Sequence, residues 1–381
     1  MKPLDYSGPV APSRRARSGG TKRPRPAIVK EMARAAGLVL VDQSALRLTR
    51  RKAGRGYCYF DASGRLITDE PTRARLASLA VPPAHTQVRY ADDPRAHLQA
   101  VGYDAAGRLQ YRYHPRWELV RERCKAERLA RFAEALSTIR RAVARDLGSP
   151  PGSRTFALSA VVELVTLTAI RAGEEGYARA RGTRGAATLL KSNLRREEGQ
   201  LILSFRAKGG RRTVCQITDP RFITIVSSLS ALPGRRLFQY RDDARAVRTV
   251  RAGDVNAYLK EVASVPVSLK DFRTLVASAS VLDILARAEP ASSARARNAQ
   301  VVAAIRVAAE TLNNTPAICR KSYVMPAVVA AFEDGTLSRF AATLKRCRSP
   351  IRRAGILAEL IRESCGAGAS VTLKDAPRAS P

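Results

Sequence analysis

The sequence predicts an α+β fold in which a small β-rich domain precedes a larger, mainly helical domain that contains a β-hairpin. Between residues 31 and 114, aromatic and turn residues alternate as they do in short antiparallel strands. From Trp117 onward, apolar residues recur every three or four positions, which is the spacing of amphipathic helices. The chain has 381 residues, 45% of them hydrophobic, and is long enough for two packed domains.

Two β-hairpins are predicted in the first domain, each with a four-residue turn that contains Asp and Gly. Their arms and turns are 57–60, 61–64 and 65–68, and then 97–103, 104–107 and 108–113. Pro82 and Pro83 should interrupt regular structure between the hairpins, and a short helix is expected over residues 70–80.

The second domain is predicted to consist mostly of helices. The expected helices are 117–147, 155–171, 219–230, 254–263, 270–287 and 295–312. One β-hairpin interrupts them, with arms at 200–205 and 211–217 and Lys208 at its tip. Because a two-stranded hairpin is only marginally stable alone, this one should pack on the helices.

Both ends of the chain are predicted to be flexible. Residues 1–30 are rich in Pro, Gly, Ser and Arg, which is typical of a disordered basic arm, and a second tail is expected over 346–381. The two domains then cover 31–114 and 115–345, with a linker near residues 114–120.

The formal net charge of +34 indicates a polyanionic partner, for which DNA and RNA are the usual candidates. Charge alone also fits a ribosomal protein, a nucleoid packing protein or charge carried by the tails. The start of the chain has no apolar signal-peptide core, and no apolar run reaches the roughly 18 residues that span a bilayer, so a membrane or secreted protein is not expected.

Cysteine and histidine usage excludes several kinds of site. The six cysteines lie far apart without a CxxC pair, which argues against a zinc site or a disulfide scaffold and fits reduced thiols in a cytoplasm. The only histidines are His85, His97 and His114, so a catalytic histidine in the rest of the chain is excluded.

Four separated segments contain side chains suited to phosphoryl transfer without a metal. They are RAGEEGY with Arg171, RAKGG with Lys208, SLKDFRT with Lys270 and Arg273, and LNNTPAICRKSYVMP with Asn314 and Tyr323. Planar, permanently charged guanidinium groups match the non-bridging oxygens of a phosphodiester transition state. Lys270 and Arg273 are three residues apart and therefore share one face of a helix.

The reaction also needs a proton donor and a nucleophile. A lysine among other cations has a lowered pKa and can protonate the leaving 5′ oxygen. A tyrosine phenol, with a pKa of about 10, can attack phosphorus and later leave again, which suits a reversible reaction better than a serine hydroxyl. Taken singly, such residues are more often solvated charges or packed aromatics, so the hypothesis depends on their order along the chain.

That order resembles the compact type IB DNA topoisomerases of bacteria and poxviruses, whose catalytic domain is shared with tyrosine recombinases. The similarity extends over residues 81–326. Its segments are HLQAVGYDAAGRLQYRYHPRW, RAGEEGYARARGTRGAATLL, LPGRRLFQYRDD, DVNAYLKEV, SLKDFRT and NNTPAICRKSYVMP.

The resemblance implies a role for each reacting residue. Tyr323 would be the nucleophile, Lys208 the general acid and Lys270 an assisting cation, while Arg171 and Arg273 would clamp the phosphate. Asn314 lies nine residues before Tyr323, where many relatives have His and some bacterial ones have Asn; either side chain can donate a hydrogen bond to a phosphate oxygen. The implied DNA-contacting residues are Gln110, Tyr111, Tyr113 and Tyr177.

The resemblance also implies an activity. Such an enzyme relaxes supercoiled double-stranded DNA through a 3′-phosphotyrosine intermediate, as a monomeric C-shaped clamp in the bacterial cytoplasm, at the nucleoid. No cofactor is expected, because the sequence has neither a GxxxxGK[ST] nucleotide motif nor an acidic metal triad.

Some residues depart from the family pattern without replacing the reacting groups. His85 stands where Trp is common, Gly176 where an acidic residue is usual, and Asn313 and Ala207 where Gly is usual. Two alternatives therefore stay open. One is a tyrosine recombinase, although those enzymes usually have HxxR where this chain has KDFR and lack the N-terminal hairpin. The other is a DNA-binding relative without catalytic activity.

Overall fold

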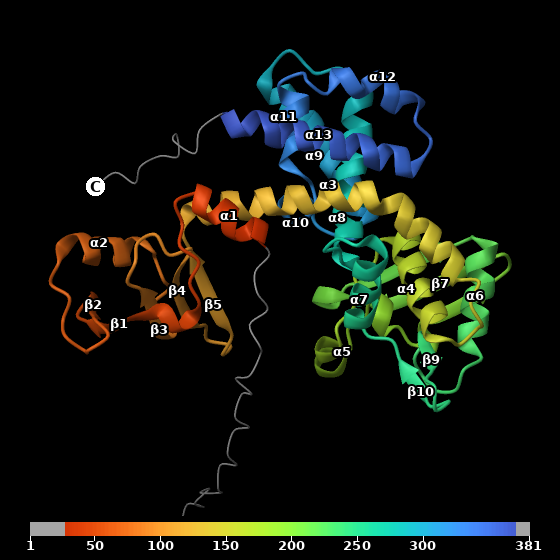
Figure 1. The fold of residues 1–381 in the computed structure, drawn as a ribbon, viewed down its shortest axis with the longest axis horizontal. Helices are drawn as coiled ribbons and strands as arrows, with labels where there is room; N and C mark the ends of the chain where they lie inside the picture. The colour runs from red at the N-terminus through yellow and green to blue at the C-terminus, as the bar shows by residue number, and fades with distance from the viewer. Residues whose placement is uncertain (1–26, 371–381) are drawn as a thin grey trace, which may run out of the picture. The chain divides into compact units, whose positions relative to one another are not determined.

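The computed structural model describes residues 27–370, and they form an α+β fold of helices and antiparallel sheets (Figure 1). The predicted fold class is confirmed. The chain divides into two compact units, one up to Val120 and one from Arg121. Most of the predicted N-terminal arm, residues 1–26, lies outside the described residues, and residues 27–30 belong to helix α1 (Ala27–Ala35).

The first unit is built on a five-stranded antiparallel sheet with strand order β2-β1-β3-β4-β5. Its strands are β1 (Leu46–Ala53), β2 (Gly56–Phe60), β3 (Thr86–Ala91), β4 (Leu98–Tyr103) and β5 (Leu109–Tyr113), and α2 (Glu70–Ser78) is the expected short helix. The second predicted hairpin is confirmed, because β4 pairs with β5 and places Val101 opposite Tyr111. A small core under the sheet contains Leu48, Tyr59, Leu76 and Tyr90.

The first predicted hairpin is only partly present, because the main partner of strand β2 is not the segment 65–68 but strand β1. Strand β2 pairs with β1, with Arg50 opposite Tyr59, and the connection between them is the two-residue turn Gly54–Arg55. Gly54 has a φ of 55°, a conformation that glycine adopts without strain. The segment 65–68 still pairs with the end of β2 as predicted, through the Phe60–Leu66 bridge and two backbone hydrogen bonds of 2.9 Å, from Asp61 to Arg65 and from Ile67 to Tyr59. Strand β1 was missed because its Arg-rich second half is solvent-exposed and hides the alternation of the buried Leu46 and Leu48.

The second unit contains all the helices predicted after residue 150. They are α4 (Arg154–Thr168), α6 (Pro220–Ser230), α7 (Ala252–Ala263), α8 (Leu269–Arg287) and α9 (Ala294–Thr311). The long helix α3 (Pro115–Asp146) is also present, but it begins within the first unit. The residues expected to form a linker, 114–120, are therefore helical after His114, because Pro115 is well suited to the first turn of a helix.

The predicted internal hairpin is present as β7 (Gln200–Arg206) and β8 (Arg212–Ile217). A third strand, β6 (Leu194–Glu197), extends it into a small antiparallel sheet. The hairpin packs on the helices as expected, because Leu201, Leu203 and Phe205 belong to the main core of the unit.

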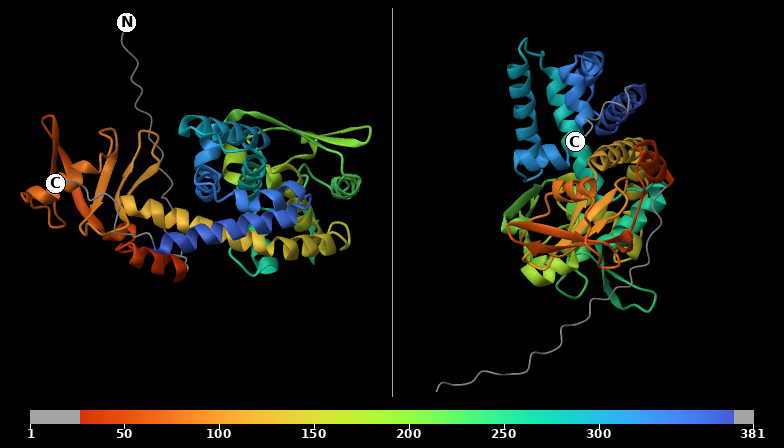
Figure 2. Two further views of the ribbon diagram at one scale, coloured as in Figure 1. Left: turned by 90° about the horizontal axis from the view of Figure 1, so that it is seen from above. Right: turned by 90° about the vertical axis from the view of Figure 1, so that its left-hand side faces the viewer.

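The predicted flexible C-terminal tail is wrong over most of its length. Helix α12 (Ser338–Arg346) is followed by α13 (Pro350–Ser370), and α13 packs against α8 and against α11 (Pro326–Glu333) (Figure 2). Ala354, Leu357 and Ile361 recur at helical spacing and are almost fully buried. Only residues 371–381 of the expected tail lie outside the described part of the chain.

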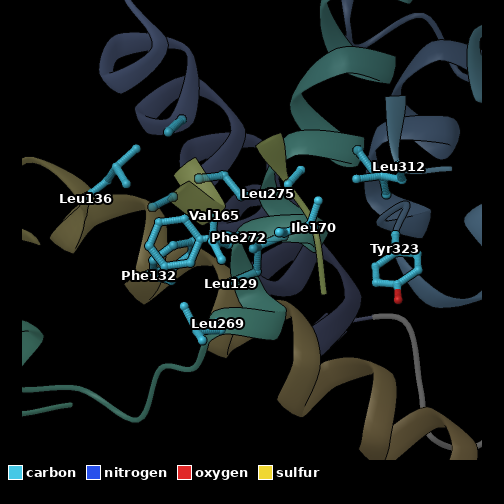
Figure 3. Packing of buried hydrophobic residues seen from close by; sticks show 14 of the residues in the cluster. Leu129, Phe132, Leu136, Val165, Ile170, Leu269, Phe272, Leu275, Leu312 and Tyr323 are labelled. Carbon is cyan, nitrogen blue, oxygen red and sulfur yellow. The ribbon is translucent and has the colours of Figure 1, made fainter. Parts of the chain in front are cut away.

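One large apolar core holds the second unit together (Figure 3). Phe132 of α3 meets Phe272 of α8 edge to face, with ring centroids 4.8 Å apart. The core extends to Tyr323, which places that phenol at the edge of a rigid, packed region rather than on a loose loop. Among residues 27–370, no helix combines the length and apolar composition needed to cross a bilayer.

Candidate active site

Four of the predicted reacting residues meet at the junction of several elements of the second unit. Arg171 follows the end of α4, Arg273 lies on α8, Asn314 follows α9, and Tyr323 closes α10 (Pro316–Ser322). Helix α4 ends three residues before the predicted limit, because its C-cap Ala169 takes a left-handed conformation with a φ of 51°. Arg171 therefore lies in the non-helical segment that follows α4.

The segment that carries Arg171 is held by a close crossing of two backbones. The amide of Ala186 donates to the carbonyl of Arg171 at 2.8 Å, and Gly173 and Gly185 face each other at the crossing. A Cβ on Gly185 would lie 2.4 Å from the Arg171 carbonyl oxygen, and one on Gly173 would lie 2.5 Å from Thr188 Oγ1. Gly173 also has a φ of 82°, so both positions require glycine.

Arg273 is the most enclosed of the four residues, with 3% of its surface exposed. Its Nη1 donates to the carbonyl of Ala169 and its Nη2 to the carbonyl of Leu312 at 2.9 Å. The guanidinium carbon lies 4.9 Å from the ring centroid of Tyr323. Arg273 therefore joins the end of α4, the end of α9 and the phenol.

Arg171 and Asn314 form the second half of the cluster. Arg171 Nη2 donates to Asn314 Oδ1 at 2.5 Å. This bond orients the Asn314 amide and leaves its buried Nδ2 donor without a partner among the described residues. The preceding Asn313 has a φ of 49°, which explains why the family usually has Gly here and why Asn, a residue that tolerates this conformation, can replace it. Its side chain also donates to Thr213 of β8 at 2.9 Å.

The backbone of Tyr323 is held from two directions. Its amide donates to the carbonyl of Cys319 at 2.9 Å within the last turn of α10. Its carbonyl accepts a 3.0 Å hydrogen bond from Ser278 Oγ, which itself accepts from the amide of Met325 at 3.0 Å. Ser278 is fully buried on α8, and sequence patterns did not single it out. In Figure 3 the Tyr323 hydroxyl points away from Leu312.

The charges around Tyr323 favour its ionised form. Burial raises the pKa of the phenol, but the charge and hydrogen bond of Arg273, followed by those of Arg171, lower it by more. The net pKa is below the ordinary value of 10.0. A phenol prepared in this way is a better nucleophile near neutral pH and a better leaving group in the reverse step.

The two predicted lysines are placed differently from the four clustered residues. Lys208 is exposed at the hairpin tip, where Gly209 and Gly210 both have positive φ values. Lys270 is exposed in the first turn of α8, whereas Arg273, one turn later, is buried. Within residues 27–370, neither lysine is hydrogen-bonded to the four clustered residues, and no group of His, Cys, Asp or Glu side chains could hold a metal ion.

Comparison with known proteins identifies the family of the chain. A family model for the catalytic core of eukaryotic DNA topoisomerase I matches residues 116–349, and one for the N-terminal domain of bacterial DNA topoisomerase IB matches residues 56–104. A DNA topoisomerase 1B of Acanthamoeba polyphaga mimivirus is 30% identical over 285 residues, which cover 73% of this chain and 84% of that relative. The chain belongs to the type IB DNA topoisomerases.

In this type IB topoisomerase, the predicted DNA-contacting residues of the first unit lie on β5. Tyr111 and Tyr113 share one face as predicted, with stacked rings 6.1 Å apart and exposures of 43% and 41%. Gln110 donates to Asp104 at 2.8 Å, and together with Tyr111 and His85 it lines a cavity of about 380 Å³. His85, a departure from the family pattern, is thus a neighbour of two predicted DNA contacts.

The remaining predicted contact, Tyr177, is 58% exposed on α5 (Glu175–Arg181) of the topoisomerase. The guanidinium of Arg181 lies 5.7 Å from its ring centroid. Gly176, beside it, is exposed and has open space around it, so the departure at this position leaves the helix undisturbed. Ala207, in contrast, is buried at the start of the turn that carries Lys208, and its amide donates to the carbonyl of Arg211 at 2.8 Å across that turn.

A further arginine near the topoisomerase cluster was not predicted. Arg184 lines a cavity of about 160 Å³ that is also lined by Arg171 and Arg273. In a chain with 67 Lys and Arg residues, no local pattern distinguishes Arg184 from a solvated charge. Only the tertiary fold brings it beside the clustered residues.

Proposed function

We propose that this enzyme relaxes supercoiled DNA by cutting one strand through a covalent bond to Tyr323 and then rejoining it, without ATP or a metal ion. The observation that carries the proposal is the cluster itself: a phenol with a lowered pKa lies beside two arginines, one of which is bonded to the Asn314 amide. These groups supply a nucleophile and several hydrogen-bond donors at one place.

In the forward step, the Tyr323 oxygen attacks a backbone phosphorus, and the bond from phosphorus to the 5′ oxygen breaks. The phenol proton passes to solvent, and the departing 5′ oxygen takes a proton from Lys208. Arg171 and Arg273 stabilise the charge on the non-bridging oxygens, and the free Nδ2 of Asn314 adds a neutral donor. Lys270 assists as a second cation near the leaving group.

The reverse step restores the DNA. After the cut strand has rotated, the 5′ hydroxyl attacks the 3′-phosphotyrosine, returns its proton to Lys208 and releases the Tyr323 phenolate. One phosphodiester bond is exchanged for another, so no external energy source is needed. The side chains proposed to hold the duplex are Gln110, Tyr111, Tyr113 and Tyr177, and the enzyme is proposed to act as a monomeric C-shaped clamp on nucleoid DNA in a bacterial cytoplasm.

The test is plasmid relaxation in EDTA without ATP, on positively and on negatively supercoiled DNA. Relaxation of both signs is expected, and Tyr323→Phe should abolish cleavage while leaving DNA binding nearly unchanged, because it removes one oxygen and no charge. Denaturant-trapped complexes should carry DNA on a peptide that contains Tyr323. Strict dependence on magnesium, or an adduct on another tyrosine, would overturn the proposal.

The same assay separates the two alternatives. A tyrosine recombinase would join strands from different duplexes, so recombinant products should appear when two labelled duplexes are mixed. A DNA-binding relative without activity would shift the plasmid in a gel and leave its linking number unchanged.

A further inference from the structure

A third arginine opens onto the cavity beside the catalytic cluster. The cavity of about 160 Å³ is lined by Arg184 together with Arg171 and Arg273. Its other walls come from the β7–β8 hairpin, through Phe205 and Ala207, and from the end of α9. Arg184 therefore faces the same space as the two arginines of the proposed phosphate clamp.

Two backbone hydrogen bonds fix the position of the Arg184 main chain, from which its side chain extends. The amide of Arg184 donates to the carbonyl of Arg206 at 2.7 Å, two residues before Lys208. Two residues later in the chain, the amide of Ala186 donates to the carbonyl of Arg171 at 2.8 Å. Arg184 is thus held between the strand that leads to the proposed general acid and the segment that carries one clamp.

The guanidinium of Arg184 has no carboxylate partner in the described chain. It is half-buried, and its Nη1 donates only a long hydrogen bond of 3.5 Å, to the carbonyl of Thr188. Glu175, the acidic group that acts on it, is already engaged in an ion pair with Arg236. Glu310 also lines the cavity but is exposed and forms no ion pair with Arg184.

Burial and neighbouring positive charges both disfavour the protonated, charged form of Arg184. Burial lowers the pKa of this guanidinium, Arg236 lowers it further, and Arg235 adds to the effect, while Glu175 opposes them. A partly buried charge without a counter-ion is costly, and an anion placed beside it removes part of that cost. The arrangement is that of an anion site.

We propose that Arg184 binds a second phosphate of the cleaved DNA strand, next to the scissile one, and so sets the position of the strand in the active site. The proposal rests on the proposed function. A second phosphate fits better than the scissile one. Arg273 lies 4.9 Å from the Tyr323 ring and Arg171 bonds to Asn314, whereas the side chain of Arg184 bonds to Thr188 and contacts neither Tyr323 nor Asn314 among the described residues.

The experiment is single-turnover cleavage of a duplex oligonucleotide with one cleavage site, in which each phosphate near that site is replaced in turn by a neutral methylphosphonate. Wild type, Arg184→Ala and Arg184→Lys are compared. With natural DNA, Arg184→Ala should weaken binding or cleavage roughly 10- to 100-fold, the scale of one charge-assisted hydrogen bond. Arg184→Lys should recover part of the loss, because it keeps the charge and loses the planar fork.

The decisive result is non-additivity at one position. At the phosphate that Arg184 contacts, the neutral substitution should cost the wild type as much as Arg184→Ala does, and should cost Arg184→Ala little more. In parallel, the slope of log affinity against log salt should fall by about 0.9 for Arg184→Ala. The matched control is Arg352→Ala, which removes an equal charge from an exposed position on α13, outside the cavity.

Two results would overturn the proposal. Losses that add at every phosphate would show that Arg184 contacts none of them. Competition by inorganic phosphate that disappears in Arg184→Ala, together with additive losses, would assign the site to a free anion. Should Arg184→Ala fold poorly, Arg184→Gln repeats the scan. If the wild type relaxes DNA while the scan is additive, this proposal alone fails, whereas a wild type that never relaxes DNA removes the proposed function as well.

Discussion

At Tyr323, burial raises the pKa of the phenol and two nearby arginines lower it, and the arginines have the larger effect. Because the pKa of Tyr323 is lower in the folded than in the unfolded protein, ionisation of the phenol adds to the free energy of unfolding at alkaline pH. This added stability is complete above about pH 10 and is lost as the pH falls through the pKa of the folded state. The same balance predicts what removal of each arginine does to the phenol.

We expect Arg273→Ala to raise the pKa of Tyr323 and Arg171→Ala to raise it less, because Arg273 contributes the larger lowering effect. The measurement is ultraviolet titration of the DNA-free protein, with the Tyr323→Phe titration subtracted to isolate this phenol. In the wild type, the isolated phenol should ionise below pH 10. A wild-type value at or above 10, or no rise in either variant, would contradict the account.

Lys208 offers a second test at the residue scale. If it is the general acid, Lys208→Ala should slow cleavage by roughly 10²- to 10⁴-fold, the usual scale of proton transfer from a positioned group. Replacing the bridging 5′ oxygen by sulfur should restore the rate, because a thiolate leaves without a proton. Arg273→Ala should remain slow on both substrates. Failure of sulfur to rescue Lys208→Ala would limit the lysine to an electrostatic role and make Lys270 the next candidate.

The residues that form the cluster could be predicted from the sequence. The fold places Arg171, Arg273, Asn314 and Tyr323 together, whereas the chemical role of each residue stays a prediction. It could not predict the contacts between them. Arg171 meets Asn314 across 143 positions of the chain, and no local spacing encodes such a distance. The contribution of Ser278 could not be predicted for the same reason, because its hydroxyl bonds to the backbone of Tyr323, 45 positions away.

At the scale of elements, α8 holds Tyr323 at two points. Arg273 lies beside its ring, and Ser278 bonds to its carbonyl and to the amide of Met325. One helix therefore holds the backbone of Tyr323, the proposed nucleophile, and also sets the electrostatic surroundings of its ring. Loss of the serine hydroxyl should disturb both.

We expect Ser278→Ala to slow cleavage about tenfold, to raise the pKa of Tyr323 and to lower the free energy of unfolding by about 1–3 kcal/mol, because two backbone groups lose their buried partner. Ser278→Cys, which keeps a weak donor and acceptor, should lie between. Ser280→Ala, two residues along the same helix, is the control and should change little. A purely structural serine would lower stability while the Tyr323 pKa and the cleavage rate per folded molecule stayed constant.

Periodicity predicted the long helices well, since α3, α4, α8 and α9 bury regular apolar stripes. Periodicity did not predict elements that are only partly buried, or elements whose neighbours in the sequence are typical of a disordered tail. Strand β6 is short and almost wholly polar, so its pairing with β7 leaves no alternation in the sequence. Helix α13 follows an Arg-rich stretch and precedes the last residues, and its buried Leu357 was read as part of a tail.

At the scale of the whole molecule, the formal net charge of +34 should govern DNA affinity. If roughly six to ten phosphates are neutralised, affinity should fall on the order of 10³- to 10⁵-fold between about 50 and 200 mM salt, because binding releases condensed counterions. Titration of a labelled duplex at several salt concentrations measures the slope, and relaxation should likewise collapse at high salt. A flat response would mean that the charge lies away from the DNA.

The crossing of Gly173 and Gly185 limits how this protein can change over generations. Glu174 and Gly176 nearby are exposed, and a Cβ on Gly176 would meet open space, so substitutions there should be tolerated. At the crossing itself, however, a single added carbon would meet backbone or Thr188 and push the Arg171 segment aside. Since no second substitution can make room where two main chains touch, random mutagenesis with selection for function should leave these two positions unchanged in an otherwise permissive surface region.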